Sequence, residues 1–457
     1  MSTHRSFRRL GALPLKTAAE TGFAILAIYH FSGAEILPAG TSGAGEDSGE
    51  GGAAFYLLNA SIWVVALILS LRRPKAFWRA CTADGALIAL LSLALISVLW
   101  SAAPDIAFRR ALALLGTSLF GIYLHLRYPL EEQLKLLAWG LGAGIVLSLP
   151  IVAFSGGESS GLLVRGIYEN KNSLGRMMAL AALVYLFLAW TKQHRPTALM
   201  FMGLSVALVL IASSATALVV VLTVAGMIPM LRTLDRDIRP LIVIGCIGVL
   251  VVGAVGLFMA PSAESITGLV GRDVTLTGRT ALWAAVLQTI GERFWLGYGY
   301  ETFWLSNLAF RVAVDEGAGW TAPNAHNGFL EITLDLGILG LLLFVFTLAR
   351  GASRAVRMFQ SQRTPLALWP LVYLCFLALY NLTESTALAR LNLCWVLYVT
   401  TLLNVSPKAS RAAEAARGRS GRTPLRTRPA LGYFAAHERS LLSAEPLPSD
   451  QPPRGRS

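Results

Sequence analysis

Charged residues are scarce in this chain of 457 residues. Asp, Glu, Lys and Arg make up only 14% of it, whereas hydrophobic residues make up 55%. An ordinary soluble domain has about 25% charged residues. This shortage excludes a disordered chain and argues against an ordinary soluble enzyme. Because a membrane-spanning helix needs about 20 mostly apolar residues, the composition instead has room for a polytopic membrane protein.

Cysteine is rare as well. The four cysteines, Cys81, Cys246, Cys375 and Cys394, all lie in apolar runs. Their spacing matches neither a metal site nor a paired disulfide framework, so we interpret them as small core residues. The sequence also lacks the clustered acids and histidines of a dedicated divalent-metal site. We therefore predict no metal and no other cofactor.

Long apolar segments recur along the chain. They lie near residues 21–40, 53–71, 81–100, 108–126, 134–154, 174–191, 239–260, 325–349, 366–381 and 388–405. A further run of 35 residues, Thr197 to Leu231, is too long for one span, and the polar Ser213, Ser214 and Thr216 near its middle predict two helices joined by a tight turn. The sequence thus predicts an all-α, polytopic integral membrane protein with about 12 transmembrane helices.

The distribution of charge tests this count, because Lys and Arg accumulate in cytoplasmic loops. With the N-terminus inside, the cytoplasmic segments hold 29 basic and 10 acidic residues, and the outer segments hold 10 basic and 16 acidic residues. The formal net charge of +13 is therefore +19 inside and −6 outside. We interpret it as a sign of orientation, with an even number of spans and both termini cytoplasmic, and not as a sign of a nucleic-acid partner.

These patterns divide the chain into five parts. Residues 1–20 form a cytoplasmic N-terminal segment before an uncleaved first span, and residues 21–260 form transmembrane helices 1–9. Residues 261–324 form a long periplasmic loop, residues 325–405 form helices 10–12, and residues 406–457 form a basic, disordered cytoplasmic tail.

The long outer loop is too long for a simple connector, so we expect it to be structured. Leu282, Val286 and Ile290 recur at helical spacing and predict a helix lying in the outer membrane interface. Several aromatic residues follow, and they either form an interfacial aromatic belt or bind sugar rings: Trp295, Tyr298, Tyr300, Phe303 and Trp304.

Basic residues on the outer side oppose the usual charge bias and are candidates for function. Arg272 and Arg279 are seven residues apart, and a guanidinium offers a planar fork of donors that suits phosphate oxygens. Surface ion pairs are the alternative for either residue. Arg165 and Lys171 lie just before a predicted span, where Asn172 or Ser173 is a candidate helix cap and the helix start is a candidate anion site.

A third outer cluster runs from Pro323 directly into a predicted span. It contains His326, Asn327 and Glu331, and Asp335 follows one helical turn later. Carboxylates inside a span are costly and point to function. A histidine near a helix start is favoured as neutral imidazole, the form that a general base needs.

Between the last two predicted spans, Asn381, Glu384 and Arg390 predict a polar bridge, which we interpret as a structural ion pair that closes the bundle.

Several of these stretches resemble the bacterial O-antigen ligase and Wzy-type polysaccharide polymerase superfamily, most strongly the exopolysaccharide polymerases of the ExoQ kind. The matching motifs are Leu276-Thr-Gly-Arg279-Thr-Ala-Leu-Trp283, Leu296-Gly-Tyr-Gly-Tyr300, Asn324-Ala-His-Asn327-Gly-Phe-Leu-Glu331 and Leu336-Gly-Ile-Leu-Gly340, supported by Gly166-Ile-Tyr-Glu-Asn-Lys171-Asn-Ser-Leu-Gly175 and Asn381-Leu-Thr-Glu384. Together they cover roughly residues 160 to 400.

The resemblance implies glycosyl transfer at the periplasmic face of the bacterial inner membrane, from a polyprenyl-diphosphate-linked oligosaccharide to a hydroxyl of an acceptor glycan. It assigns diphosphate contact to Arg279 and Arg165, with Arg272 and Lys171 as weaker candidates. His326 orients or deprotonates the acceptor hydroxyl with support from Glu331. The remaining supporting polar residues are Asn327, Asn172 and Glu384.

One position departs from the family pattern. Ligase-like members often carry an arginine after a serine at the turn between the two middle spans, where this chain has Ala215. The second phosphate-binding arginine of the ligases therefore cannot be carried over to this position.

The leading hypothesis is a repeat-unit polymerase for exopolysaccharide or a related surface glycan. The alternative is an O-antigen ligase that transfers finished glycan to lipid A core, and a hypothesis from another class is a twelve-span transporter. The implied partners are the lipid-linked donor, the glycan acceptor, membrane lipid and other polysaccharide assembly and export proteins, but no nucleic acid.

Overall fold

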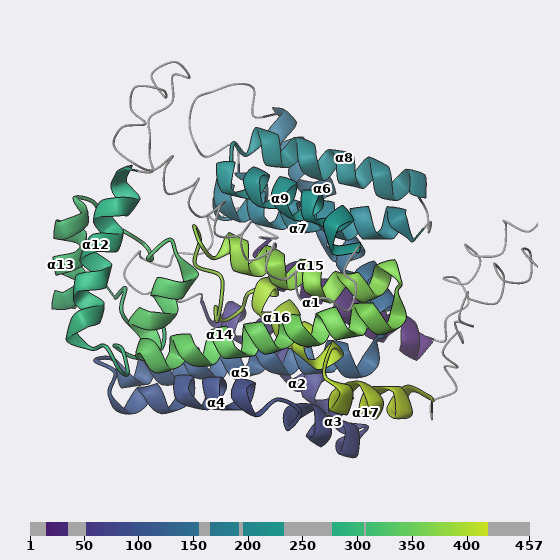
Figure 1. The fold of residues 1–457 in the computed structure, drawn as a ribbon, viewed down its shortest axis with the longest axis horizontal. Helices are drawn as coiled ribbons and strands as arrows, with labels where there is room; N and C mark the ends of the chain where they lie inside the picture. The colour runs from purple at the N-terminus through teal and green to yellow at the C-terminus, as the bar shows by residue number, and fades with distance from the viewer. Residues whose placement is uncertain are drawn as a thin grey trace, which may run out of the picture. The chain divides into compact units, whose positions relative to one another are not determined.

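A computed structural model describes residues 15–34, 52–154, 165–191, 195–232, 277–305 and 308–418. The chain divides into two compact units, residues 1–413 and 414–457. The described elements, labelled in Figure 1, are helices: α1 (Leu15–Phe31), α2 (Ala53–Leu71), α3 (Pro74–Cys81), α4 (Gly85–Ile96), η2 (Ser97–Leu99), α5 (Pro104–Arg127), α6 (Leu130–Phe154), α7 (Lys171–Trp190), α8 (Arg195–Ile211), α9 (Ala215–Arg232), α12 (Thr277–Glu292), α13 (Ala309–Ala318), α14 (Gly328–Gln362), α15 (Pro365–Tyr380), α16 (Leu393–Asn404) and α17 (Pro407–Gly418).

The predicted all-α class is confirmed for the described residues, where β structure is limited to one isolated bridge between Ala34 and Tyr168. Five helices are long and apolar enough to cross a membrane, namely α2, α5, α6, α7 and α14, and the pair α3 and α4, bent by 78°, counts as a sixth. Four further apolar helices are shorter: Arg195–Ile211, Thr216–Pro229, Pro365–Tyr380 and Leu393–Asn404. The total of about 12 spans stays a prediction, as does the extent of the outer loop.

Each segment predicted to span the membrane contains a helix, apart from the segment near residues 239–260, which lies outside the described residues. The predicted break in the long run from Thr197 to Leu231 is confirmed. Helix α8 ends at Ile211 and α9 begins at Ala215, and Ser213 between them has a φ of 52°. A left-handed residue of this kind reverses the chain within a few residues.

Long-range ion pairs join helices that are distant in the sequence. Asp84, only 2% exposed at the start of α4, pairs with Arg350 and Arg354 of α14 at 2.7 and 3.0 Å. A second pair joins Arg127 of α5 to Glu20 of α1. These pairs hold the helices together, and the side of the membrane on which they lie stays a prediction.

Helix α14 packs against α4, α12, α15 and α16, and it is kinked at Gly337, which has a φ of 65°. The kink frees the carbonyls of Leu334 and Asp335 from the helix. They accept hydrogen bonds from the backbone N–H groups of Tyr298 and Gly299, at 2.8 and 2.9 Å. The two glycine-containing motifs near residues 298 and 337 are therefore one structural unit.

Side chains would not fit where these segments meet. A Cβ on Gly337 would lie 2.2 Å from the carbonyl carbon of Trp295, and a Cβ on Gly297 would lie 2.5 Å from the carbonyl oxygen of Leu334. Both glycines also have positive φ values. The close backbone approach and the left-handed conformation each require glycine here.

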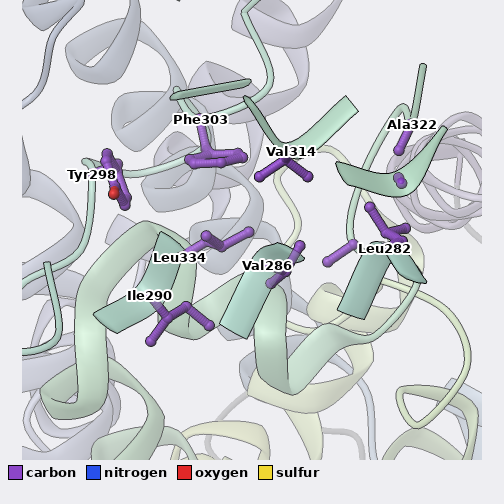
Figure 2. Packing of buried hydrophobic residues seen from close by; sticks show 10 residues of the cluster. Leu282, Val286, Ile290, Tyr298, Phe303, Val314, Ala322 and Leu334 are labelled. Carbon is purple, nitrogen blue, oxygen red and sulfur yellow. The ribbon is translucent and has the colours of Figure 1, made fainter. Parts of the chain in front are cut away.

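Helices α12 and α13 pack together in a hydrophobic cluster with the start of α14 (Figure 2). Leu282, Val286 and Ile290 line one side of α12 and are buried against Val314 of α13 and Leu334 of α14, among others. The predicted helix is thus present, and its apolar periodicity is explained by packing within the protein. Its location in the membrane interface stays a prediction.

The aromatic residues of this region do not form one belt. Tyr298, Tyr300 and Phe303 are buried, with at most 2% exposure, so they fill the core and cannot stack on a sugar. Trp295 is 66% exposed, and Trp304 donates a hydrogen bond to Glu331. Neither of the two interpretations holds for the group as a whole, because the segment is exposed up to Leu296 and buried from Gly297 to Tyr300.

Replacing Gly337 with Ala should destabilise the protein by about 3 kcal/mol or more, since a Cβ must displace backbone at a position with positive φ. A matched control is Gly203→Ala in α8, where nothing lies within 4 Å of the added Cβ. That change should be neutral or stabilising by up to about 1 kcal/mol because alanine favours helix. Thermal unfolding of both variants in detergent checks the difference, and equal melting temperatures would contradict the proposed role of the kink.

Candidate functional site

The site is built around the carboxylate of Glu384, which lies just after α15 and is 8% exposed. Its Oε1 accepts a hydrogen bond from Nδ2 of Asn172 at 3.0 Å and pairs with Nη2 of Arg279 at 3.2 Å. Arg279 also donates from Nη1 to the carbonyl oxygen of Thr383 at 2.7 Å. Residues from α7, α12 and the turn after α15 therefore converge on one buried charge.

His326 approaches the other oxygen of this carboxylate. Its Nδ1 lies 3.7 Å from Oε2 of Glu384, slightly beyond hydrogen-bond distance, and makes no hydrogen bond to a described residue. The backbone of His326 is left-handed, with a φ of 47°, and its N–H donates to Oδ1 of Asn324. The ring of Trp320 lies beside the imidazole, with 5.9 Å between ring centroids. A bulky residue in this conformation is uncommon and is held by its surroundings.

The helix start after His326 is fixed from both sides. Asn327 caps α14, because its Oδ1 accepts the N–H groups of Phe329 and Leu330. Its Nδ2 donates to the carbonyl oxygen of Leu382 at 3.2 Å, and the N–H of Gly328 donates to that of Asn381 at 2.8 Å. These bonds tie the His326 segment to the turn that carries Glu384.

Glu331 contacts the segment that carries His326, but in the described part of the chain no hydrogen bond or ion pair joins it to the imidazole. Its carboxylate accepts hydrogen bonds from Nε1 of Trp304 at 2.7 Å, the N–H of Ala325 at 2.8 Å and Oγ of Ser385 at 3.3 Å. Ser385 in turn accepts the N–H of Asn327. Glu331 thus holds the backbone just before His326, and the carboxylate nearest to the imidazole is Glu384.

The remaining predicted residues lie elsewhere in the contact network. Arg165 donates to the carbonyl oxygen of Glu169 at 3.0 Å within its own turn, and Lys171 is exposed. Arg272 lies outside the described residues. The hydrogen bonds of the described residues bring Arg279, His326, Asn172 and Glu384 together, but they do not join Arg165 or Lys171 to this group.

Two sequence interpretations are wrong. Asn172 does not cap α7, because the cap is Asn170, whose side chain accepts the N–H of Ser173. Asn172 lies two residues further on, within the first turn of α7, and its side chain donates to Glu384. Arg390 does not pair with Glu384 either, since it binds Glu301 at 2.6 Å. In both cases the partner is set by packing between distant segments, which local spacing does not show.

Arg176 is one of the ten basic residues that the charge distribution places on the outer side, and no motif in the sequence gives it a role. It lies four residues after Asn172 on α7, so the two side chains share one face of the helix. Its Nε is buried and has no hydrogen-bond partner among the described residues. The signal that could have identified it is its place inside a predicted span, where charged residues are costly.

The electrostatics favour an ionised Glu384. Burial by itself would raise the pKa of this carboxyl, but the neighbouring His326 and the charges of Arg279 and Arg176 outweigh burial and lower the pKa below its ordinary value. Within the described chain, no group of three or more His, Cys, Asp and Glu residues is arranged to hold a metal ion. The arrangement offers cationic donors and an imidazole around one carboxylate, a combination suited to an anionic substrate with a transferable proton.

The molecule is thus a helical membrane protein with a cationic, histidine-containing site at one end of its helices. The O-antigen ligase family matches residues 200–345, a stretch that includes Arg279, His326 and Glu331. The exopolysaccharide production protein ExoQ of Rhizobium meliloti is 26% identical over 274 residues, which cover 57% of this chain and 63% of that protein. The O-antigen ligase of Pseudomonas aeruginosa is 27% identical over 346 residues, which cover 73% of this chain and 79% of the ligase.

These similarities confirm the predicted resemblance to the O-antigen ligase and polysaccharide polymerase superfamily. The match to the ExoQ protein spans less than two thirds of that protein's length.

Replacing Glu384 with Gln should lower the melting temperature at neutral pH by several degrees, because it removes the charged partner of the partly buried Arg279, a change that costs up to about 3–5 kcal/mol. Since the pKa of Glu384 is lowered in the folded state, its contribution is complete above its ordinary value of 4.5 and is lost as the pH falls through the lowered value. The difference in melting temperature between the wild type and the variant should therefore shrink on acidification.

Thermal unfolding from neutral pH to about pH 3 measures this difference. Glu316→Gln, at an exposed position on α13, is the control and should not change the pH dependence. A difference that persists unchanged at the lowest pH would show that the charge of Glu384 is not what stabilises the site.

Proposed function

We propose that this protein transfers a glycan from a polyprenyl-diphosphate-linked oligosaccharide to a hydroxyl of an acceptor glycan, at the periplasmic face of the bacterial inner membrane. The observation that carries the proposal is the convergence of Arg279 and His326 on the buried carboxylate of Glu384, 3.2 and 3.7 Å away. It combines a permanent cation for a leaving diphosphate with a base for the attacking hydroxyl, and the lipid tail can stay in the membrane throughout.

In the proposed reaction, the acceptor hydroxyl oxygen bonds to the anomeric carbon of the donor sugar. The bond from that carbon to the diphosphate oxygen breaks, and polyprenyl diphosphate leaves with the electron pair. Negative charge builds up on the leaving oxygen in the transition state, and a fixed guanidinium stabilises it. Arg279 is suited to this role because Thr383 and Glu384 hold it in place before substrate binds.

His326 accepts the proton of the acceptor hydroxyl. Its Nδ1 faces the Glu384 carboxylate, which favours the tautomer with the proton on Nδ1 and leaves Nε2 as the basic atom. The carboxylate also stabilises the imidazolium that forms when the proton is taken. Glu384 is therefore proposed as the residue that orients the base, whereas the resemblance to the family implies a supporting role for Glu331.

Glu331 is proposed as a positioning residue. It binds the N–H of Ala325, directly before His326, and Ser385, directly after Glu384. Asn327 and Asn172 support the same geometry through their bonds to Leu382 and Glu384. Arg165, Lys171 and Arg272 remain predicted diphosphate contacts.

Among enzymes with this donor chemistry, we propose a repeat-unit polymerase for exopolysaccharide or a related surface glycan. The similarity to the exopolysaccharide production protein supports it. The alternative is a ligase that transfers glycan to lipid A core, which the similarity to an O-antigen ligase over a larger share of the chain favours. Both reactions use the same site and differ in the acceptor.

His326→Ala should lower kcat by about 10²–10⁴-fold, the usual contribution of a general base, with a smaller effect on donor binding. The assay uses purified protein, lipid-linked donor and acceptor, and follows the release of polyprenyl diphosphate. His30→Ala is the control, because His30 contacts Asn59 of α2 and belongs to another part of the helix packing. A correctly inserted His326→Ala protein with full activity would exclude His326 as the base.

The glycan that accumulates in a deletion strain separates the two acceptors. Loss of a polymerase should leave single repeat units on the lipid carrier, because no step then joins them. Loss of a ligase should leave long polymer on the carrier, because only the final transfer is missing. Electrophoresis of the lipid-linked fraction distinguishes these outcomes, and long carrier-bound polymer would refute the polymerase in favour of the ligase.

A further inference from the structure

Arg176 is a partly buried cation with no fixed partner. It lies within α7, a helix long and apolar enough to cross the membrane. In the part of the chain that the structure describes, neither a hydrogen bond nor an ion pair joins it to another residue, and its Nε is shielded from solvent. By contrast, three other outer arginines, Arg279, Arg311 and Arg390, each have a carboxylate within 3.4 Å.

The position of Arg176 relates it directly to the site around Glu384. Asn172, one helical turn earlier on the same face of α7, donates to Glu384 and accepts from the hydroxyl of Tyr380 at 3.2 Å through its carbonyl oxygen. Gly175 packs closely on the turn between α8 and α9, where its Cβ would lie 2.7 Å from that of Ser214. Arg176 therefore lies one turn further into the helix bundle than the contact between Asn172 and Glu384.

An unpaired charge in this place is energetically unfavourable. Charged residues within a span are costly and normally pair with another charge or with a polar ligand. The charge of Arg176 acts on Glu384, but no hydrogen bond or ion pair between described residues joins the two, and Oε1 of Glu384 already accepts from Asn172 and Arg279. With Arg279 and Arg176 facing one carboxylate, the site keeps an excess positive charge that an anionic ligand would balance.

We propose that Arg176 is a second diphosphate-binding residue, which holds the phosphate nearer the lipid while Arg279 holds the phosphate nearer the sugar. The order follows from their places in the fold, since Arg176 lies within a membrane-spanning helix and Arg279 lies in the first turn of α12, in the predicted outer loop. The inference rests on the proposed function and adds to it the residue that meets the lipid side of the donor. Lipid-side recognition then comes from α7, and sugar-side recognition comes from α12.

Ligand-dependent thermal stability tests this assignment, because a ligand that binds the folded protein stabilises it by an amount that grows with the logarithm of the ligand concentration divided by Kd. The probes are farnesyl diphosphate and farnesyl monophosphate, added to the full chain in lipid nanodiscs. The variants are Arg176→Gln, Arg176→Lys and Arg279→Gln. Arg293→Gln, at an exposed arginine over the ring of Tyr298, is the matched control.

We expect Arg176→Gln to weaken the binding of both probes by about 10- to 100-fold, the usual effect of losing one charge-assisted hydrogen-bonded contact. Arg176→Lys should weaken binding less, since it keeps the charge. Arg279→Gln should weaken farnesyl diphosphate more than the monophosphate, and Arg293→Gln should bind like the wild type. Without ligand, Arg176→Gln should melt at the wild-type temperature or above it, because no described contact is lost.

Results that contradict the role of Arg176 can be told apart from results that contradict the proposed function. Wild-type affinity in Arg176→Gln, with binding by the wild type intact, would overturn the role of Arg176 and leave the proposed function standing. A melting temperature of Arg176→Gln well below that of the wild type without ligand would show a structural role and would also overturn it. Failure of the wild type to bind farnesyl diphosphate would refute diphosphate recognition itself, and with it both proposals.

Discussion

The burial of one carboxylate, Glu384, constrains the candidate site more than any other interaction. A buried carboxylate is unfavourable unless donors replace the water that it has lost. Here the donors come from Asn172 and Arg279, which are 212 and 105 residues away in the sequence. Because both must reach the same oxygen, α7, α12 and the turn after α15 have to meet at one place. The position of His326 beside the second oxygen follows from that meeting, so the chemistry and the packing of the site share one cause.

A second constraint, on the backbone of α14, places the segment that carries Arg279. The left-handed Gly337 interrupts the helix and offers the carbonyls of Leu334 and Asp335 to the segment around Tyr298. Free carbonyls inside a membrane protein must be satisfied internally, so the kink and the segment depend on each other. Leu334 also belongs to the hydrophobic cluster that fixes α12. The kink thus orients the helix whose first turn holds Arg279, although neither glycine motif touches the site.

The sequence was sufficient for features that depend on local pattern, such as the apolar helices and the turn at Ser213. It was insufficient where a residue's partner is set by tertiary approach. Asn172 has the spacing of a helix cap, yet Asn170 takes that role and frees its side chain for Glu384. Glu331 is predicted to support the site of His326, yet its hydrogen bonds go to Trp304, Ala325 and Ser385, and Glu384 is the carboxylate beside the imidazole. In each case several hydrogen-bond partners were chemically equivalent, and the packing of distant helices determines which of them lies within reach.

The distribution of charge connects the topology with the site. Cations on the outer side work against insertion in the predicted orientation. Arg279 and Arg390 each form an ion pair with a carboxylate, which offsets this cost. Arg176 does not, and it lies deeper along a membrane-spanning helix, where the cost of a charge is higher. Stability and orientation would both be served by an apolar residue at this position. A cation that neither folding nor topology requires is explained most directly by an anion that is present only during function, and we propose that this anion binds beside the neighbouring Arg279 and His326.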